Sequence, residues 1–353
     1  MYQPLKIGNL TAEVPIVQGG MGVGISLERL ASAVAKCGGV GILSAAQIGY
    51  REQNYEENPL KANLEAVKKY VNKAKEMAQG KGILGINIMV ATQNYEEYVK
   101  AAVEADADLI VSGAGLPVNL PEFTKGTNTK IAPIVSSTKA ANVILKMWDK
   151  KYNTTADMVV IEGPEAGGHL GFKKDEINTI SRLDYSGEIK KIMEVVKEYG
   201  KKYGRKIAVV AGGGIYTRRD AHDMMELGVD GIQVATRFVT TEECDADMAY
   251  KESYLRAKKQ DIVIVDSPVG MPGRAINNSF LESVKEKKQP VSKCYRCIKG
   301  CNGKDNPYCI SRALVNAVKG NVDEGLLFCG AGAYKADKIE TVKEVMQDLL
   351  QGM

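Results

Sequence analysis

The sequence predicts an α/β protein: a (β/α)8 TIM barrel with a C-terminal cap of helices and loops. Three observations support this fold class. Eight short apolar runs recur along the chain, helical patterns lie between them, and most runs end in glycine, serine or asparagine. Each run is nearly all apolar rather than alternating, as in parallel strands that are buried on both faces. Eight strand–helix units favour a closed barrel over an open, doubly wound sheet.

The eight predicted strands all lie before residue 240. In chain order they are Val14–Gly20, Val40–Ala45, Ile83–Val90, Leu109–Gly113, Ile131–Ser136, Met158–Gly163, Ile207–Gly212 and Gly231–Phe238. An open nucleotide-binding sheet is the weaker alternative, because it would need the spacing G-x-G-x-x-G after its first strand. The glycines within Gly19–Gly24 do not have that spacing.

Helices are predicted between the strands from apolar residues at spacings of i, i+3, i+4 and i+7. The first helix begins after Ser26, a suitable N-cap, and stops at Gly38-Gly39. Further patterns cover Leu60–Ala74, Tyr95–Ala102, Ala140–Met147 and Ile189–Val196, and Thr217–Asp220 resembles a capping box before another helix. The loop after the sixth strand, residues 164–187, is long enough to suggest a function.

The chain continues well beyond the eighth strand. Cys244–Arg256 has a helical pattern, residues 261–276 are mixed and turn-rich, and a cysteine-rich loop follows. Two more helical patterns flank Gly325–Tyr334. We therefore expect residues 1–240 to form the barrel and residues 241–353 to form an extension that closes its mouth.

The composition indicates an ordinary globular protein. Hydrophobic residues make up 44% and charged residues 25%, which excludes a disordered or fibrous chain. A net charge of +4 gives no reason to expect nucleic acid or a membrane as a partner. The sequence has no apolar run of about 20 residues, as a membrane span needs, and its start lacks the features of a signal peptide. A cytoplasmic location is therefore expected, with the seven cysteines as thiols or metal ligands rather than disulfides.

The ends of the predicted strands are rich in small residues, and active sites of (β/α)8 barrels lie there. Phosphate groups in such barrels are commonly held by the loops after strands seven and eight. Here those loops contain Gly212, Gly213 and Gly214, and then Ala235 and Thr236. The sequence therefore predicts a phosphate site at these residues, although a helix-entry turn could also need the glycines.

His169 is the candidate catalytic residue. It lies among glycines after the sixth strand, where an imidazole could act as a general base or donate a hydrogen bond to a substrate oxygen. His222, the only other histidine, falls on the polar side of a predicted helix. Glu162 and Glu165 flank the same loop as His169, but no motif of a serine hydrolase or a zinc protease is present.

Four cysteines near the C-terminus leave two interpretations open. Cys294, Cys297, Cys301 and Cys309 could bind zinc or an iron–sulfur cluster, since four thiolates suffice. Their spacing is not the paired C-x-x-C of a zinc ribbon, so a loop of reduced thiols is the favoured interpretation and no metal site is assigned.

Six segments together resemble the nitronate monooxygenase family, formerly called 2-nitropropane dioxygenases, which shares its barrel with the flavin-dependent enoyl-acyl-carrier-protein reductases. The matching segments are Pro15–Met21, Gly85–Ile88, Ser136–Lys139, Glu165–His169, Gly212–Ile215 and Gly231–Phe238. They occur in the order typical of the family. Two features depart from it: Ala235 stands where a glycine is usual, and the cysteine-bearing extension is longer than the minimal family form.

The resemblance implies a non-covalent FMN. By position, Gly20, Met21 and Gly22 would follow the edge of the flavin ring, and Gly167 would line the ring. Asn87 and Lys139 would hydrogen-bond ring or ribityl oxygens. The phosphate would be held by Gly213, Gly214, Ala235 and Thr236. His169 matches the active-site histidine of the family. The implied reaction is oxidation of an alkyl nitronate with O2 to a carbonyl compound and nitrite, with Lys139 stabilising the charge of the reduced flavin. A small-molecule substrate, O2 and a possible homodimer are the implied partners.

Two alternatives remain at this stage. The first keeps the fold and the FMN, and is an NAD(P)H-dependent enoyl-acyl-carrier-protein reductase. The second belongs to another class: a non-catalytic flavoprotein, or a redox sensor that uses the four C-terminal cysteines.

Overall fold

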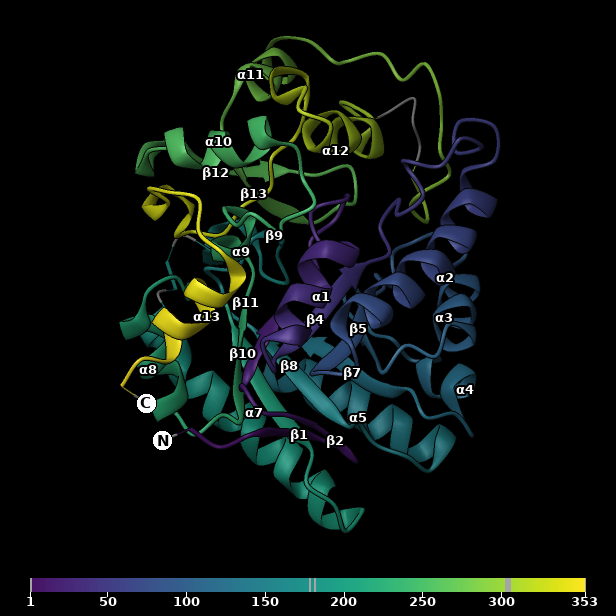
Figure 1. Cartoon of the computed structure of the whole chain (residues 1–353), viewed down its shortest axis with the longest axis vertical. Coiled ribbons are helices and arrows are strands. Elements are labelled where there is room, and N and C mark those ends of the chain that lie inside the picture. The colour runs from purple at the N-terminus through teal and green to yellow at the C-terminus, as the bar shows by residue number, and fades with distance from the viewer. Residues whose placement is uncertain (1, 178, 181, 302–305, 353) are drawn as a thin grey trace.

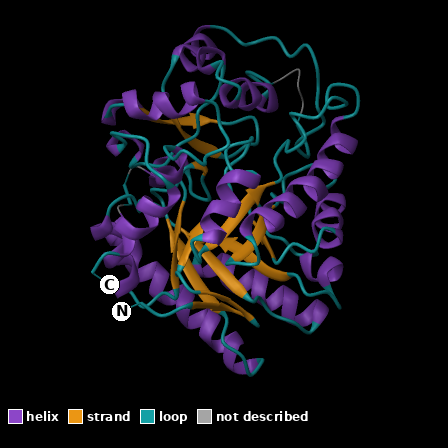
Figure 2. Ribbon diagram, viewed as in Figure 1, coloured by secondary structure: helices purple, strands orange, loops and turns teal. Residues whose placement is uncertain are grey.

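Eight parallel strands close into a barrel in the computed structural model of this chain, which describes residues 2–177, 179–180, 182–301 and 306–352. The order around the barrel is β10-β11-β3-β4-β5-β6-β7-β8, and Figure 2 shows the strands surrounded by helices. The strands are β3 (Ile16–Gln18), β4 (Val40–Ser44), β5 (Ile83–Asn87), β6 (Leu109–Ser112), β7 (Lys130–Val135), β8 (Met158–Glu162), β10 (Ala208–Gly212) and β11 (Gly231–Val234). The predicted fold class and all eight predicted strands are therefore confirmed.

The eighth strand is shorter than predicted. β11 ends at Val234, and a short helix, α9 (Thr236–Val239), follows where the strand was expected to continue. This turn places the buried guanidinium of Arg237 3.1 Å from Glu340 and 2.6 Å from Asp348. The prediction was wrong here because contacts with distant residues outweigh the local strand propensity.

Helices cover the outside of the barrel (Figure 1). They are α1 (Glu28–Lys36), α2 (Pro59–Ala78), α3 (Tyr95–Glu104), α4 (Leu120–Thr124), α5 (Thr138–Tyr152), α7 (Arg182–Lys202) and α8 (Arg218–Glu226), with the short α6 (Lys174–Ile177) before α7. The C-terminal helix α13 (Val342–Leu350) packs against both α8 and α1 and so completes the ring. The predicted division at residue 240 stays a prediction, but α13 lies beyond it in sequence and still belongs to the barrel wall.

Ser26 is not the N-cap of α1, contrary to the prediction. Its hydroxyl accepts a hydrogen bond from the Met21 backbone N–H at 2.7 Å. The N–H groups of Leu27 and Leu30 are instead bonded by the carboxylate of Asp245, at 2.8 and 3.1 Å. A carboxylate from the extension therefore caps α1 in place of a neighbouring residue. No sequence pattern near α1 could indicate this distant cap.

Other predicted helix features have mixed outcomes. The capping box of α8 is present, with Thr217 and Asp220 bonded reciprocally. The apolar face of α5 is displaced by one residue from the predicted one: Trp148 is fully buried, whereas Met147 is exposed. The indole of Trp148 explains this rotation, since it donates to the Pro117 carbonyl at 3.0 Å. α7 begins at Arg182, within the residues that were predicted to be loop.

A hairpin that the sequence analysis did not predict fills the barrel end opposite the cap. It consists of β1 (Leu5–Ile7) and β2 (Leu10–Ala12), which pair antiparallel (Figure 1). Its side chains join the cluster inside the barrel, whose buried members include Leu5, Ile7, Ala12, Val17, Val40, Ile83, Val111, Met158 and Val210. The lower barrel is thus a packed core, and any ligand must enter from the other end.

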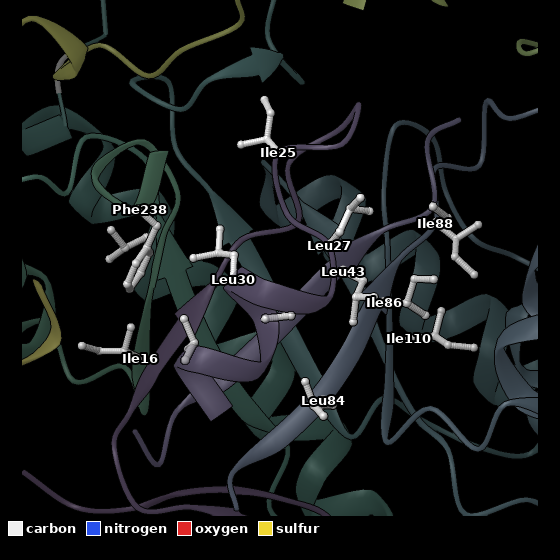
Figure 3. Packing of buried hydrophobic residues seen from close by; sticks show 14 of the residues in the cluster. Ile16, Ile25, Leu27, Leu30, Leu43, Leu84, Ile86, Ile88, Ile110 and Phe238 are labelled. Carbon is white, nitrogen blue, oxygen red and sulfur yellow. The ribbon is translucent and has the colours of Figure 1, made fainter. Parts of the chain in front are cut away.

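A larger apolar cluster lies between the barrel and its helices. Figure 3 shows part of it, with Leu30 of α1 beside Ile16 and Phe238, and with Leu43, Ile86 and Ile110 from consecutive strands. Burial of this kind is the main stabilising contribution in a barrel of this size. None of the helices in the described ranges is long and apolar enough to cross a bilayer.

The cap lies at the carboxyl ends of the strands, at the top of Figure 1. Its elements are α10 (Met248–Arg256), η1 (Lys259–Asp261), β12 (Ile262–Asp266), β13 (Pro272–Ile276), α11 (Ser279–Glu286), α12 (Ile310–Val318), η2 (Val322–Glu324) and η3 (Ala333–Lys335). β12 and β13 form a hairpin where a turn-rich segment was predicted. β13 also pairs with β9 (Gly168–His169), so the cap forms a small sheet with the loop after the sixth barrel strand.

Candidate active site

A cavity lies at the carboxyl ends of the barrel strands, beneath the cap. All eight strand ends contribute to its walls, at the place where (β/α)8 barrels carry their active sites. It contains about 1460 Å³ of space, its open mouth included. A cavity at this position is where a barrel of this kind binds its ligands.

The structure brings most of the predicted site residues together on the cavity walls. They are Gly20, Met21, Gly22, Asn87, Gly167, His169, Gly213, Gly214, Ala235 and Thr236. Two predicted residues are not on the walls. Gly212 is the last residue of β10, just before the wall begins, and Lys139 lies exposed in the first turn of α5. Ser137 caps that helix by accepting from the Ala140 N–H, and the chain has already turned outward at Lys139.

The sequence analysis predicted that the extension closes the barrel mouth, but it assigned no site residue to the wall that the cap contributes. It is formed by Tyr254 of α10, Leu314 of α12 and residues 328–332. The signal that could have found it is the run Cys329–Gly332, in which small residues allow close approach of the backbone.

Close backbone contact joins the cap to the loop after β8. A Cβ atom at Gly167 would lie 2.6 Å from the Cys329 carbonyl carbon and 2.6 Å from the Gly330 nitrogen. The Ala331 N–H donates to the Glu165 carbonyl at 3.1 Å. Gly167 is therefore required because two backbones meet there, and a larger residue would push the cap away from the barrel.

The ends of β10 and β11 form a cradle that suits an anion. Gly213 and Gly214 both have positive φ values, +101° and +81°, a conformation that glycine adopts without strain, and they lie where barrels of this kind commonly hold a phosphate. Thr236 adds a hydroxyl beside them, which accepts from the Gly330 N–H at 2.9 Å and keeps its own proton for a ligand. The residues that line the described cavity include no lysine or arginine, so an anion there would be held mainly by backbone dipoles.

One carboxylate lies close to this cradle. A Cβ at Gly214 would overlap the Glu165 carboxylate, so the two groups are in contact. A phosphate at Gly213 and Gly214 would repel this carboxylate. Glu165 is only partly buried, so its side chain has room to rotate away when an anion binds.

His169 lies between the cavity and the cap. Its Nε2 atom is 2.7 Å from the Ser267 Oγ atom, and its ring contacts the Phe328 ring edge-on at 4.9 Å between centroids. Burial lowers its pKa to about 4, so the imidazole is neutral at neutral pH. His222 is remote from the cavity, with Nε2 3.1 Å from the Gln351 carbonyl oxygen near the C-terminus.

Glu162 supplies a second titratable group in the cavity. It is the last residue of β8, and burial raises the pKa of its carboxyl to about 7. Among the described residues, no charged group or hydrogen-bond donor is recorded against this carboxyl. In both groups burial disfavours the charged form: the pKa of the Glu162 carboxyl is raised, and the pKa of the His169 imidazole is lowered.

The four C-terminal cysteines lie outside the cavity lining. Cys294 is exposed, Cys297 is buried, and Cys301 and Cys309 are partly exposed. Burial, with smaller effects from Cys309 and Cys301, raises the pKa of Cys297 to about 11, which keeps this thiol protonated at neutral pH. No group of three or more potential ligands is arranged to hold a metal among the described residues, which omit 302–305 within this segment.

Comparisons with known proteins agree on one family. A family model described as nitronate monooxygenase matches residues 3–352. A probable nitronate monooxygenase of Staphylococcus saprophyticus is 27% identical over 297 residues, which are 79% of this chain and 80% of the relative.

Solved structures show the same fold. FabK from Thermotoga maritima has a TM-score of 0.70 and 25% identity, and the match covers 96% of this chain and 93% of FabK. A nitroalkane oxidase from Streptomyces ansochromogenes has a TM-score of 0.71 at 18% identity, with 95% and 94% of the two chains covered.

Proposed function

The chain belongs to the nitronate monooxygenase family and is an oxidoreductase; from this premise we propose that it binds FMN and oxidises alkyl nitronates with O2 to a carbonyl compound and nitrite. One observation carries the proposal. A glycine cradle for an anion and a neutral imidazole, that of His169, open into the same cavity at the barrel mouth.

The anion cradle suits the FMN phosphate. Gly213 and Gly214 would bind phosphate oxygens through their N–H groups, and Thr236 would donate its hydroxyl. Ala235 would line the same end. Since none of the described lining residues is a lysine or an arginine, the phosphate would depend on backbone donors. The Glu165 carboxylate would have to move away from Gly214 first.

The adjoining wall, at the ends of β3 and β5, suits a flat ring. Gly20, Met21 and Gly22 follow β3, and the absence of side chains at the two glycines leaves their backbone open to the cavity. A Cβ at Gly20 would lie 2.5 Å from the Asn87 Cβ, so the glycine also makes room for this amide. Asn87 would hydrogen-bond a polar edge of the flavin, and Gly167 would lie against the ring. Lys139 has no part in this proposal because it lies outside the cavity.

Bound FMN supplies the redox chemistry: it accepts electrons from the substrate and passes them to O2. The residues of the chain bind, orient and shield. His169 would either act as the base that removes the α-proton of a nitroalkane or donate a hydrogen bond to the oxygens of its nitro or nitronate group. Met89, Leu314 and Phe328 give that part of the cavity an apolar wall, which suits the alkyl portion of a nitronate.

The test is anaerobic mixing of the FMN-loaded protein with propyl-2-nitronate, NADH or NADPH, while the flavin absorbance is followed. We expect bleaching by the nitronate alone, with nitrite formed when air is admitted. A His169→Ala variant should retain FMN and lose most of this reaction. Protein that cannot be reconstituted with FMN would overturn the proposal.

A second candidate is an NAD(P)H-dependent, FMN-containing enoyl-thioester reductase. It is favoured by the similarity to FabK over 96% of the chain and by the apolar wall of Leu314 and Phe328, which would also accept an acyl chain. Fast bleaching by a nicotinamide, with none by the nitronate, would select this candidate over the first.

A further inference from the structure

We propose that Ser267 holds His169 in the tautomer that carries its proton on Nδ1, so that the ring offers an N–H donor, not a base, to an anionic substrate. This inference rests on the proposed function for the identity of that anion. It concerns a residue of the cap that has no place in the barrel site predicted from the sequence.

The cap determines the position of His169 through the backbone. His169 and Gly168 pair with Gly273 and Arg274 of β13 in antiparallel register. The Arg274 guanidinium also donates to the carbonyls of Pro164, at 3.0 Å, and of Ala166. The backbone of the loop that carries the histidine is therefore held by the cap through the β9–β13 pairing and through Arg274, and the ring of His169 is the part left to be oriented.

The ring is held by two contacts from the cap. The Phe328 ring packs against it edge-on, and the Ser267 Oγ atom lies 2.7 Å from Nε2. Ser267 itself is only 8% exposed. With this ring orientation Nε2 is engaged by the protein, and no described residue hydrogen-bonds Nδ1, which leaves that atom for a ligand of the cavity.

A count of donors and acceptors at Ser267 indicates which group carries the proton. Its hydroxyl oxygen already accepts from the Val269 backbone N–H at 3.3 Å. If the hydroxyl donates to Nε2, both the Ser267 hydroxyl and Nε2 of His169 have partners. If Nε2–H donates instead, the nearly buried hydroxyl proton has no acceptor among the described residues, which costs free energy. The first arrangement is therefore favoured, and in a neutral imidazole it leaves the proton on Nδ1.

This assignment separates two roles that the sequence left open for His169. A neutral imidazole with Nδ1–H in the cavity can bond a nitronate oxygen but cannot remove a proton from that side. The ring lies in an environment that disfavours its charged form, so it remains a one-proton group at neutral pH. We therefore expect the enzyme to use preformed nitronate anions and to act poorly on neutral nitroalkanes.

Nitrogen NMR of the histidine rings tests the tautomer directly. Because the chain has only two histidines, protein with 15N-labelled histidine gives the nitrogen signals of two rings, two from each, and a His222→Gln variant assigns them. At pH 7, without FMN, we expect the shifts of the Nδ1–H form for His169. The Nε2–H form would overturn the inference.

Two Ser267 variants test whether this residue is the cause. Ser267→Ala should shift His169 toward the Nε2–H form that dominates in free histidine, whereas Ser267→Thr, which keeps the hydroxyl, should retain Nδ1–H. An unchanged tautomer in folded Ser267→Ala would overturn the inference. If that variant does not fold, the parent spectrum and the threonine variant still decide, since loss of Nδ1–H in either contradicts it.

Kinetics with the FMN-loaded protein extend the test to the substrate. We expect Ser267→Ala to raise the KM for propyl-2-nitronate about tenfold, as for loss of one oriented hydrogen bond to a charged group. Ser267→Thr should restore the parent KM. Nitronate oxidation by an enzyme with an Nε2–H ring would contradict this inference alone. An Nδ1–H ring in a protein that oxidises no nitronate would support the tautomer and overturn the proposed function.

Discussion

The barrel side and the cap side of the cavity are built in different ways. On the barrel side the wall consists largely of backbone at strand ends, such as Gly20, Gly213 and Gly214. On the cap side it consists of side chains, Leu314, Phe328 and the histidine that β13 and Ser267 hold. Backbone N–H donors are present whatever the side chains are, so they suit a ligand group that does not change, such as a cofactor phosphate. Side chains can be exchanged by mutation, so they suit a ligand that differs between enzymes, such as a substrate.

The largest expected effects are changes in the free energy of unfolding with pH, and they come from one titratable group on each side, Glu162 and His169. On the barrel side, the pKa of Glu162 rises from 4.5 to about 7 on folding. Folding therefore loses stability as the pH rises from 4.5 to 7, because only the unfolded chain ionises readily there. Replacing Glu162 with glutamine should have little effect at pH 4.5 and should raise the free energy of unfolding by roughly 3 kcal/mol at pH 8.

Urea unfolding of the FMN-free parent and the E162Q variant at the two pH values measures this difference. A stabilisation of equal size at both pH values would show that the effect is not due to ionisation of Glu162. Glu165→Gln is the matched control, since Glu165 lies three residues beyond Glu162, in the loop after β8.

On the cap side the pH dependence has the opposite sign. The pKa of His169 falls from 6.5 to about 4 on folding. The unfolded chain therefore binds the extra proton first, and stability is lost as the pH falls from 6.5 to 4. The free energy of unfolding of His169→Gln should therefore not show this acid-side decrease, which is roughly 3 kcal/mol in the parent at pH 4. At pH 8 the ring is neutral in both states of the parent, so the substitution should have no effect through ionisation.

Unfolding curves of His169→Gln, with His222→Gln as the control histidine variant, check this prediction. If both variants flatten the acid side of the stability profile equally, the effect is not specific to the buried ring.

Stability and FMN binding should both be affected by one added methyl group where the loop after β8 contacts the cap, at Gly167. Gly167→Ala would place Cβ against the backbone of Cys329 and Gly330, and such overpacking costs about 1–3 kcal/mol. FMN affinity should fall by about tenfold or more, because the cap and the loop after β8 must separate. Gly187→Ala is the control: no atom lies within 4 Å of its added methyl, and alanine in a helix should be neutral or stabilising.

Fluorescence titration with FMN and thermal unfolding of both variants measure this difference. Equal FMN affinity in the parent and in Gly167→Ala would show that the cap does not need to approach the loop this closely.

The smallest expected effect is at Phe328. Phe328→Leu keeps an apolar side chain but removes the edge-on contact with His169, which is worth about 0.5–1.5 kcal/mol. We expect the KM for the nitronate to rise about fivefold with FMN affinity unchanged. Steady-state kinetics and FMN titration separate the two quantities, and a loss of FMN affinity would place Phe328 against the cofactor instead.

The barrel side could be predicted from the sequence to a large degree. Its strands are continuous apolar runs, and their ends are marked by glycines that follow directly in the chain, as at Gly19–Gly22 and Gly212–Gly214. The errors there arose from distant contacts. β11 ended early at the ion pairs of Arg237, and α1 is capped by Asp245, which lies 218 residues beyond Leu27.

The cap side could not be predicted in the same way. The hairpin of β12 and β13 reads as a turn-rich segment. The barrel itself holds two further errors. The β1–β2 hairpin, at the end opposite the cap, is too short to give a clear pattern. Lys139 matches a family segment, but the start of α5 directs it to the exterior. The local sequence pattern does not determine which face of a short helix or strand packs against the rest of the protein.

The sequence by itself determined the barrel, the strand ends and the two candidate groups, a glycine cradle and His169. The reason is that strand propensity, glycine conformation and helix periodicity act over a few neighbouring residues. The tertiary structure decided the chemistry of His169. Its partner Ser267 lies 98 residues away along the chain, and only the pairing of β9 with β13 brings the hydroxyl to the ring.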